Sequence, residues 1–215
     1  AATSVGSSPT DQMLAVQRDQ AAGKYPPAAR LLFMPGLAPP NGGPDHVLRE
    51  ATNELEVVNE VSTAAEARAA VQRLARLGIK HAKMWVDDRN GTYPKLRPEA
   101  YTAIVEEAHA QKMIVHAHAI QLADQKAVLK AGADVLVHMV QRQPLDDEYL
   151  ALLREKKPYW ATVIGLGDPT ELCKPDPFFE QAMPDVVAET IRATTERRPL
   201  APTCGPPSAT AAERE

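Results

Sequence analysis

The sequence is poor in cysteine and has no long apolar run, and each absence excludes a class of protein. Its 215 residues include two cysteines, Cys173 and Cys204, which form no disulfide framework and have no partner at a metal-binding spacing. No apolar run approaches the roughly 20 residues that cross a bilayer. The start of the chain shows no signal-peptide pattern. The compartment stays open, either cytoplasmic or periplasmic and secreted.

An excess of charge of one sign is also missing. Lysine and arginine total 24 against 28 aspartates and glutamates, so charge gives no reason to expect a nucleic acid or a membrane as partner. The length suits one domain with a real core. From Arg198 onward the chain is rich in Pro, Ala and Thr without a period, which predicts a disordered tail. The expected organisation is a domain over 1–197 and a tail over 198–215.

What the chain does contain is an alternation of short apolar runs with amphipathic helical patterns. Thr63 and Glu66 form a capping box at a helix start, and Gly78 marks the stop of that helix. The predicted strands are 1–5, 30–34, 79–86, 113–118, 135–139 and 159–164; the predicted helices are 11–22, one starting near Pro98, 122–131 and 146–156; and 35–47 is a Pro/Gly loop. Such repeats predict a parallel sheet, either open and doubly wound or closed as a (β/α)₈ barrel.

Two histidines, His118 and His138, end successive apolar runs on either side of the helix that Gly132 closes. If these runs are neighbouring parallel strands, both imidazoles point into one mouth at the carboxyl ends, where they are suited to bind a metal such as zinc. The alternative is two packed or hydrogen-bonded histidines. His116 lies two residues before His118 and is the rival ligand.

Lys83 is the third candidate, because it lies inside the apolar strand 79–86. A lysine is costly to bury unless it is paired or modified. The alternative is a side chain that reaches solvent or pairs with Asp87 or Asp88. Judged on residue types alone, this second explanation is favoured.

Four segments together resemble the amidohydrolase superfamily, in its imidazolonepropionase-like and prolidase-like branch. They are IKHAKMWVDDRNGTYPKL at 79–96, IVHAH at 114–118, AGAD at 131–134 and LVH at 136–138. The resemblance runs from about residue 3 to about residue 167. It implies a (β/α)₈ barrel and a hydrolase that acts on amide or peptide-like C–N bonds, including those of Xaa-Pro dipeptides.

The resemblance also implies a ligand set. Lys83 corresponds to the carboxylated lysine of the family, and His118 and His138 correspond to its histidine ligands on the next two strands. The expected cofactor is zinc or another divalent metal, as one or two ions. A carbamate on Lys83 is an anionic oxygen donor, which gives a reason for a buried lysine and reverses the preference stated above.

The chain departs from the family at both ends. Only His46 and His81 precede Lys83 as histidines, so the His-x-His of strand 1 is missing, and Asp168 follows the seventh strand rather than the eighth. A full barrel takes about 250 residues. We therefore expect an incomplete barrel of about strands 2 to 7, with no identified catalytic base and with weak or no activity alone.

The open strand edges of such a fragment predict self-association or completion by another chain. A small molecule or a dipeptide-like compound is the expected substrate. Two other functions stay open. They are a non-catalytic α/β fragment and a module that binds a divalent metal or a small ligand.

Overall fold

The structure of the protein is a computed structural model, which describes residues 2–25, 28–44, 57–141 and 143–161. The chain divides into two units, Ala1–Val163 and Ile164–Glu215. All of the described residues belong to the first unit. The predicted domain boundary between 197 and 198, like Asp168, Cys173 and Cys204, lies outside them.

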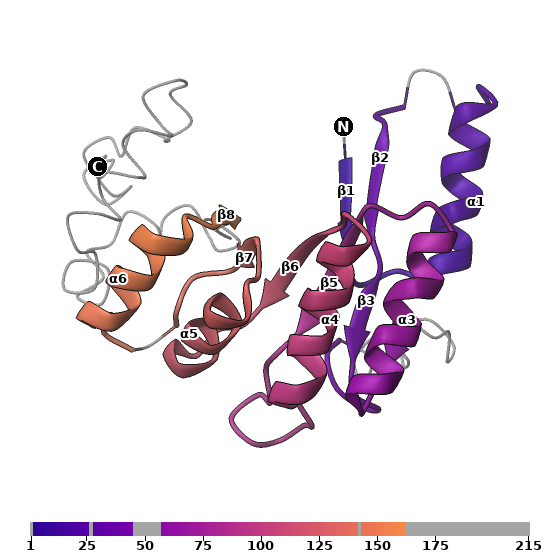
Figure 1. Ribbon diagram of the computed structural model, residues 1–215. Helices are drawn as coiled ribbons and strands as arrows, with labels where there is room; N and C mark the ends of the chain where they lie inside the picture. Colours follow the sequence, from indigo (N-terminus) through magenta and orange to yellow (C-terminus); the bar gives the residue numbers. More distant parts are fainter. Residues whose placement is uncertain (1, 26–27, 45–56, 142, 162–215) are drawn as a thin grey trace, which may run out of the picture. The chain divides into compact units, whose positions relative to one another are not determined.

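Helices and strands alternate through most of this first unit (Figure 1). In chain order they are β1 (Ala2–Val5), α1 (Thr10–Ala21), β2 (Leu31–Met34), β3 (Gly36–Ala38), β4 (Val58–Glu60), α3 (Ala64–Arg76), β5 (His81–Trp85), α4 (Pro98–Ala110), β6 (Ile114–His118), α5 (Leu122–Ala131), β7 (Val135–Val137), α6 (Asp147–Lys156) and β8 (Tyr159–Ala161). The predicted helices and strands are confirmed to within a few residues, and α5 has the predicted limits.

Two short strands differ from the prediction. The expected Pro/Gly loop at 35–47 begins with β3, and β4 was not expected. Pro35 separates β2 from β3 because proline has no N–H to donate to a neighbouring strand. Its carbonyl still accepts a hydrogen bond from the backbone N–H of Lys83, at 2.9 Å. The chain from β2 to β3 is therefore one strand with an interruption.

Every strand pair in the described part of the chain is parallel. β1 pairs with β2, and a second sheet has the order β4-β3-β5-β6-β7-β8. When β2 and β3 are counted as one strand, successive βα units lie next to each other in chain order, with β4 as an added strand. This is the strand order of a (β/α)₈ barrel over six of its strands. The predicted partial barrel is confirmed.

The helices begin and end where local chemistry dictates. Thr63 caps α3 by accepting the Glu66 N–H while the Glu66 carboxylate accepts the Thr63 N–H, so the predicted capping box is confirmed. Pro98 occupies the first turn of α4. Gly132 ends α5 with a left-handed φ of 100°, which a residue with a side chain rarely adopts.

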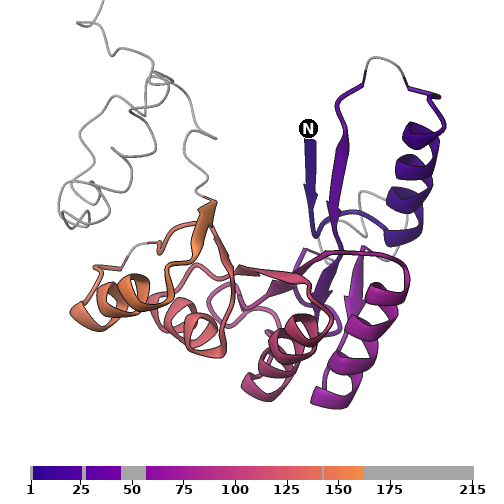
Figure 2. The same cartoon turned by 45° about the horizontal axis from the view of Figure 1, so that its top comes forward.

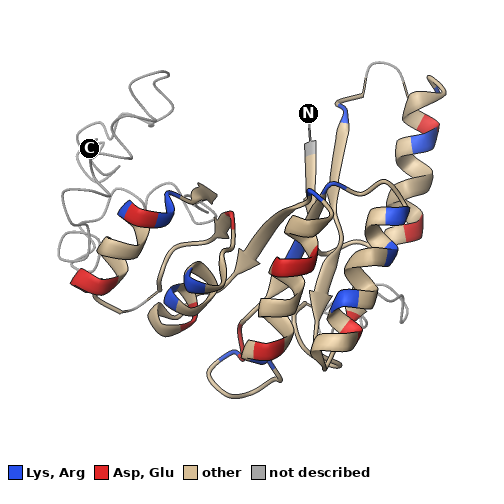
Figure 3. Cartoon of the chain, viewed as in Figure 1, with Lys and Arg blue, Asp and Glu red and all other residues tan. Residues whose placement is uncertain are grey.

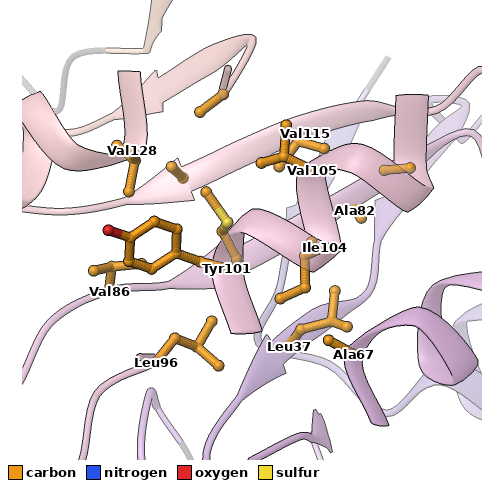
Figure 4. Packing of buried hydrophobic residues seen from close by; sticks show 14 of the residues in the cluster. Leu37, Ala67, Ala82, Val86, Leu96, Tyr101, Ile104, Val105, Val115 and Val128 are labelled. Carbon is orange, nitrogen blue, oxygen red and sulfur yellow. The ribbon is translucent and has the colours of Figure 1, made fainter. Parts of the chain in front are cut away.

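The core lies between the strands and helices α3, α4 and α5. In both views α3 and α4 lie side by side along the strands (Figures 1 and 2). Leu37, Met84, Val115 and Leu136 come from four neighbouring strands and are completely buried in one cluster with helix residues such as Ile104. Figure 4 shows Leu37, Val115 and Ile104 in this packing. The residues that β5, β6 and β7 place on this face are all apolar.

Charge is concentrated on the helices, whereas the strands are nearly free of it (Figure 3). Across β5, β6 and β7 the one lysine, arginine, aspartate or glutamate is Lys83. Within the described residues, no helix is long and apolar enough to cross a membrane.

Candidate metal centre

The two faces of the central strands carry different residue types, because alternate side chains of a strand point to opposite sides. The face away from the helices carries Lys83 and Trp85 on β5 and His116 and His118 on β6. The register pairs Lys83 with His116, and Trp85 with His118 one step nearer the carboxyl ends. β7 continues these two rows with Val135 and Val137. The polar side chains of β5, β6 and β7 thus lie on one face.

His118 and His138 meet at the carboxyl ends of β6 and β7. Their ring centroids are 4.6 Å apart and the rings are nearly perpendicular, at 78°. This separation matches the roughly 4.8 Å between neighbouring strands. The two side chains therefore lie directly next to each other, as the strand–helix–strand spacing predicts.

Lys83 reaches the ring of Trp85, although its Cα lies one row lower than that of Trp85. Its Nζ lies 4.0 Å from the centre of the Trp85 ring, and that ring lies 4.3 Å from the His118 ring. The residue is 1% exposed, so a lysine that reaches solvent is ruled out. Nor does it pair with Asp87 or Asp88, since Asp87 bonds His118 and Asp88 binds Lys95. The preference for these explanations from residue types alone was wrong.

Burial favours the neutral forms of the basic groups of this site. Burial lowers the pKa of the Lys83 amine to about 7. Burial, helped by the nearby His118 and Lys83, lowers the pKa of His138 to about 4. Burial also lowers the pKa of His118, against the opposing effect of Asp87. Neutral nitrogen atoms are the forms that bind metal ions.

The backbone at His138 is held in a strained conformation. Its φ of 80° is left-handed, which is uncommon for any residue other than glycine. Three hydrogen bonds fix it, because the His138 N–H donates to the Ala161 carbonyl at 3.0 Å and its carbonyl accepts from Trp160 Nε1 and Gln125 Nε2. Strain of this kind persists where the surroundings enforce it and is frequent at functional sites.

His116 is placed differently from His118, although both lie on the same face. Its Nε2 lies 3.1 Å from Nδ1 of His81, toward the amino-terminal ends of the strands. Burial, together with the charges of His81 and Lys83, lowers the pKa of His116 to about 4. The structure therefore brings His118, and not His116, to His138. It also gives His81 a partner that the sequence did not indicate.

Asp87 is the residue of this site that the sequence analysis did not assign. It follows β5 directly, is 4% exposed, and its Oδ2 lies 2.9 Å from His118 Nε2. Burial opposes ionisation of the Asp87 carboxyl, but its hydrogen bonds with His118 and with the Arg89 N–H lower its pKa overall. A strand-end position was the signal for His118, and the same signal was present at Asp87.

Two buried polar atoms among the described residues lack a hydrogen-bond partner, and both lie here. They are His118 Nδ1 and Trp85 Nε1. No three side chains of His, Cys, Asp or Glu in the described ranges gather closely enough to hold a metal. A three-donor site built from these residues therefore needs Lys83 besides His118 and His138. His46 lies outside the described residues.

Comparison with known proteins shows where else this fold occurs. No family model and no curated protein matches the sequence. Solved structures do match. A Xaa-Pro dipeptidase crystallised with methionine in its active site shares 22% identity over 91% of this chain and 52% of its own, with a TM-score of 0.64. Ochratoxinase from A. niger shares 22% identity over 74% of this chain and 40% of its own, with a TM-score of 0.59. Phenylurea hydrolase B shares 18% identity over 74% of this chain and 41% of its own, also with a TM-score of 0.59.

These similarities define the class of fold. The resemblance to the amidohydrolase superfamily is confirmed for the fold alone, because over the matched part the chain has the fold of solved amidohydrolase and Xaa-Pro dipeptidase structures. The chain spans about half the length, 40% to 52%, of the three solved structures named above. Phenylurea hydrolase B and a further solved structure, molinate hydrolase, are hydrolases by name.

Proposed function

We propose that this chain carries the metal site of a metal-dependent hydrolase that cleaves amide or peptide-like C–N bonds. The observation that supports this most is a row of contacts near the carboxyl ends of neighbouring parallel strands: Lys83 lies against Trp85, Trp85 against His118, and His118 against His138. Barrels of this kind carry their active sites at that end. The dipeptidase and phenylurea hydrolase among the solved structures favour C–N bonds as the target.

The residues present suit a zinc ion or a second one beside it. His118 and His138 supply neutral ring nitrogens. The Nδ1 atom of His118 is buried, has no hydrogen-bond partner in the described residues and is suited to bind a metal ion. A bound divalent metal would polarise a substrate carbonyl and lower the pKa of a water molecule. The role of the chain is to hold the ligands neutral, close together and away from competing hydrogen bonds.

Lys83 has the properties that carboxylation requires. With a pKa of about 7 a large fraction of its amine is unprotonated at neutral pH. That nitrogen forms a bond to the carbon of CO₂ and releases a proton to solvent, which yields a carbamate. The carbamate oxygens extend beyond the position of Nζ and carry the negative charge that a divalent metal prefers.

The direct test is hydrolysis of Xaa-Pro dipeptides and N-acyl amino acids by the full chain with zinc and bicarbonate. We expect slow, metal-dependent turnover or none, because the described residues include no carboxylate free to act as a base beside His138. Turnover at the rate of a complete enzyme would contradict the expectation of a weakly active fragment. The same panel, run with Lys83→Ala, assigns any slow turnover to this site.

Metal content separates the proposal from the second possible function. If the purified chain binds zinc tightly but hydrolyses nothing, a metal or small-ligand binding module is the better description. If it binds no metal, a non-catalytic α/β fragment remains. Neither of these alternatives has an observation that favours it over the hydrolase.

Association with another chain is part of the proposal. Within the described residues β1 pairs with β2 alone and β8 with β7 alone, so each offers an unpaired edge. Tyr159 on β8 is 79% exposed. Free strand edges promote pairing with another chain. Light scattering of the purified chain is expected to show dimers or larger species, and a stable monomer would contradict this.

A further inference from the structure

A buried carboxylate beside His118 determines which of its two ring nitrogens is free. Asp87 Oδ2 lies 2.9 Å from His118 Nε2, and the side chains are 3% and 9% exposed. An ionised carboxylate only accepts hydrogen bonds, whereas a neutral imidazole has one N–H and one bare nitrogen. The proton therefore lies on Nε2, and Nδ1 carries the lone pair.

Asp87 is itself held in place by the turn that follows β5. The backbone N–H of Arg89 donates to Oδ1 at 2.9 Å, and Arg89 Nε lies 3.3 Å from Oδ2. Arg89 itself has a left-handed φ of 50°, so the chain turns directly after β5. The carboxylate therefore has a fixed orientation before any ligand binds.

The other ring nitrogen has no such partner. His118 Nδ1 is buried and receives no hydrogen bond from the described residues. A buried acceptor without a donor destabilises the fold. That cost is removed when the lone pair binds a metal ion. His138, the expected second ligand, has its ring 4.6 Å from that of His118.

We propose that Asp87 is a positioning residue that holds His118 as its Nε2–H tautomer and thereby presents Nδ1 to the metal. This inference rests on the proposed function. A carboxylate that accepts the second N–H of a metal-binding histidine fixes its ring and raises its basicity, and loss of such a partner typically weakens metal binding about 10–100-fold.

The neighbouring aspartate provides a matched control. Asp88 also follows β5, but its carboxylate accepts the Gly91 N–H and pairs with Lys95 at 3.1 Å. The contacts of Asp88 do not include His118. Asp87→Asn and Asp88→Asn remove the same charge from adjacent positions. Only Asp87→Asn changes the group that faces His118.

The first readout is the tautomer, which needs no metal. Nitrogen-15 NMR of the histidine-labelled full chain at pH 7 distinguishes a protonated from a bare ring nitrogen, and His118→Gln identifies the signals. We expect His118 in wild type and in Asp88→Asn to be protonated on Nε2. In Asp87→Asn the amide either accepts or donates, so the Nδ1–H form appears. A wild-type His118 protonated on Nδ1 would overturn the inference whatever the variants do.

The second readout is zinc affinity, measured by competition with a chelator on variants whose circular dichroism matches wild type. We expect Asp87→Asn to bind zinc about 10–100-fold more weakly, Asp87→Glu to recover part of the loss, and Asp88→Asn to match wild type. Equal affinity in Asp87→Asn and wild type would refute the role of Asp87 while the metal site stands. If wild type binds no zinc, the proposed function fails, and the tautomer decides the inference alone.

Discussion

The two faces of β5, β6 and β7 are made from alternating residues of the same strands, yet they differ in almost every property. The helix-side face carries Met84, Val115 and Leu136, which are fully buried in one apolar cluster. The other face carries Lys83, Trp85 and the two histidines of β6, of which Lys83 is as deeply buried. Burial is thus shared by both faces. The helix-side face stabilises the fold, and the other face costs stability because it holds basic groups away from water.

The largest expected effect comes from the helix-side face. Leu136→Ala removes a completely buried side chain from the core, and we expect the free energy of unfolding to fall by about 2–5 kcal/mol. Urea denaturation measures this. Zinc affinity of the folded variant is expected to stay at the wild-type value. A large loss of affinity with little loss of stability would mean that the two faces are not separate in role.

Lys83→Met is expected to raise the free energy of unfolding, by an amount that depends on pH. The pKa of Lys83 is about 7 in the fold against an ordinary value of 10.5 for lysine, so between these values the unfolded chain holds a proton that the folded chain has released. Wild-type stability therefore rises with pH across this window, by at most about 1.4 kcal/mol per pH unit. The variant lacks that rise.

The stability difference between Lys83→Met and wild type should thus favour the variant most at pH 7 or below and shrink toward pH 10. Denaturation in CO₂-depleted buffer at several pH values measures it. Lys80→Met, at an exposed position three residues earlier, is the control for replacing a lysine that is not buried, and the pH dependence of Lys83→Met should exceed that of this control. A constant difference for Lys83→Met would show that the amine is charged in the fold.

The smallest expected effect tests how closely the first strand approaches Lys83. Gly6 and Gly78 both have left-handed φ, of 76° and 81°. A Cβ on Gly6 would lie 2.6 Å from Lys83 Cγ, whereas one on Gly78 would meet nothing within 4 Å. Both alanine variants bear the backbone cost, and Gly6→Ala should lose about 1–3 kcal/mol more from overpacking. Equal losses in thermal unfolding would mean that β1 does not pack on the site.

Periodicity and turn chemistry were sufficient to predict most of the fold. The capping box at Thr63, the glycine stop at Gly132 and the apolar strand before His118 are local signals, and each was confirmed. β3 was missed because it lies inside the Pro/Gly-rich segment 35–47, and β4 because two of its three residues, Asn59 and Glu60, are polar. Pairing between distant segments leaves no periodic trace in so short a run.

The candidate site was predictable in part, for the same reason. The positions of His118 and His138 follow from strand ends, which the sequence shows. The hydrogen bonds of Asp87 with His118 and of His81 with His116 depend on which strands are neighbours and in what register. Lys83 could not be weighed from residue types alone, because its burial depends on the neighbouring strands as well as on Trp85, which lies two residues further on the same face of β5.

The most direct test of the central claim is the zinc content of the full chain after equilibrium dialysis. Wild type is expected to bind one or two zinc ions. His118→Ala and His138→Ala should bind none tightly, provided that their circular dichroism matches that of wild type. His109→Ala, on helix α4 and bonded to Asp134, should bind as wild type does. Zinc binding that survives the loss of both His118 and His138, or its absence from wild type, would contradict the account.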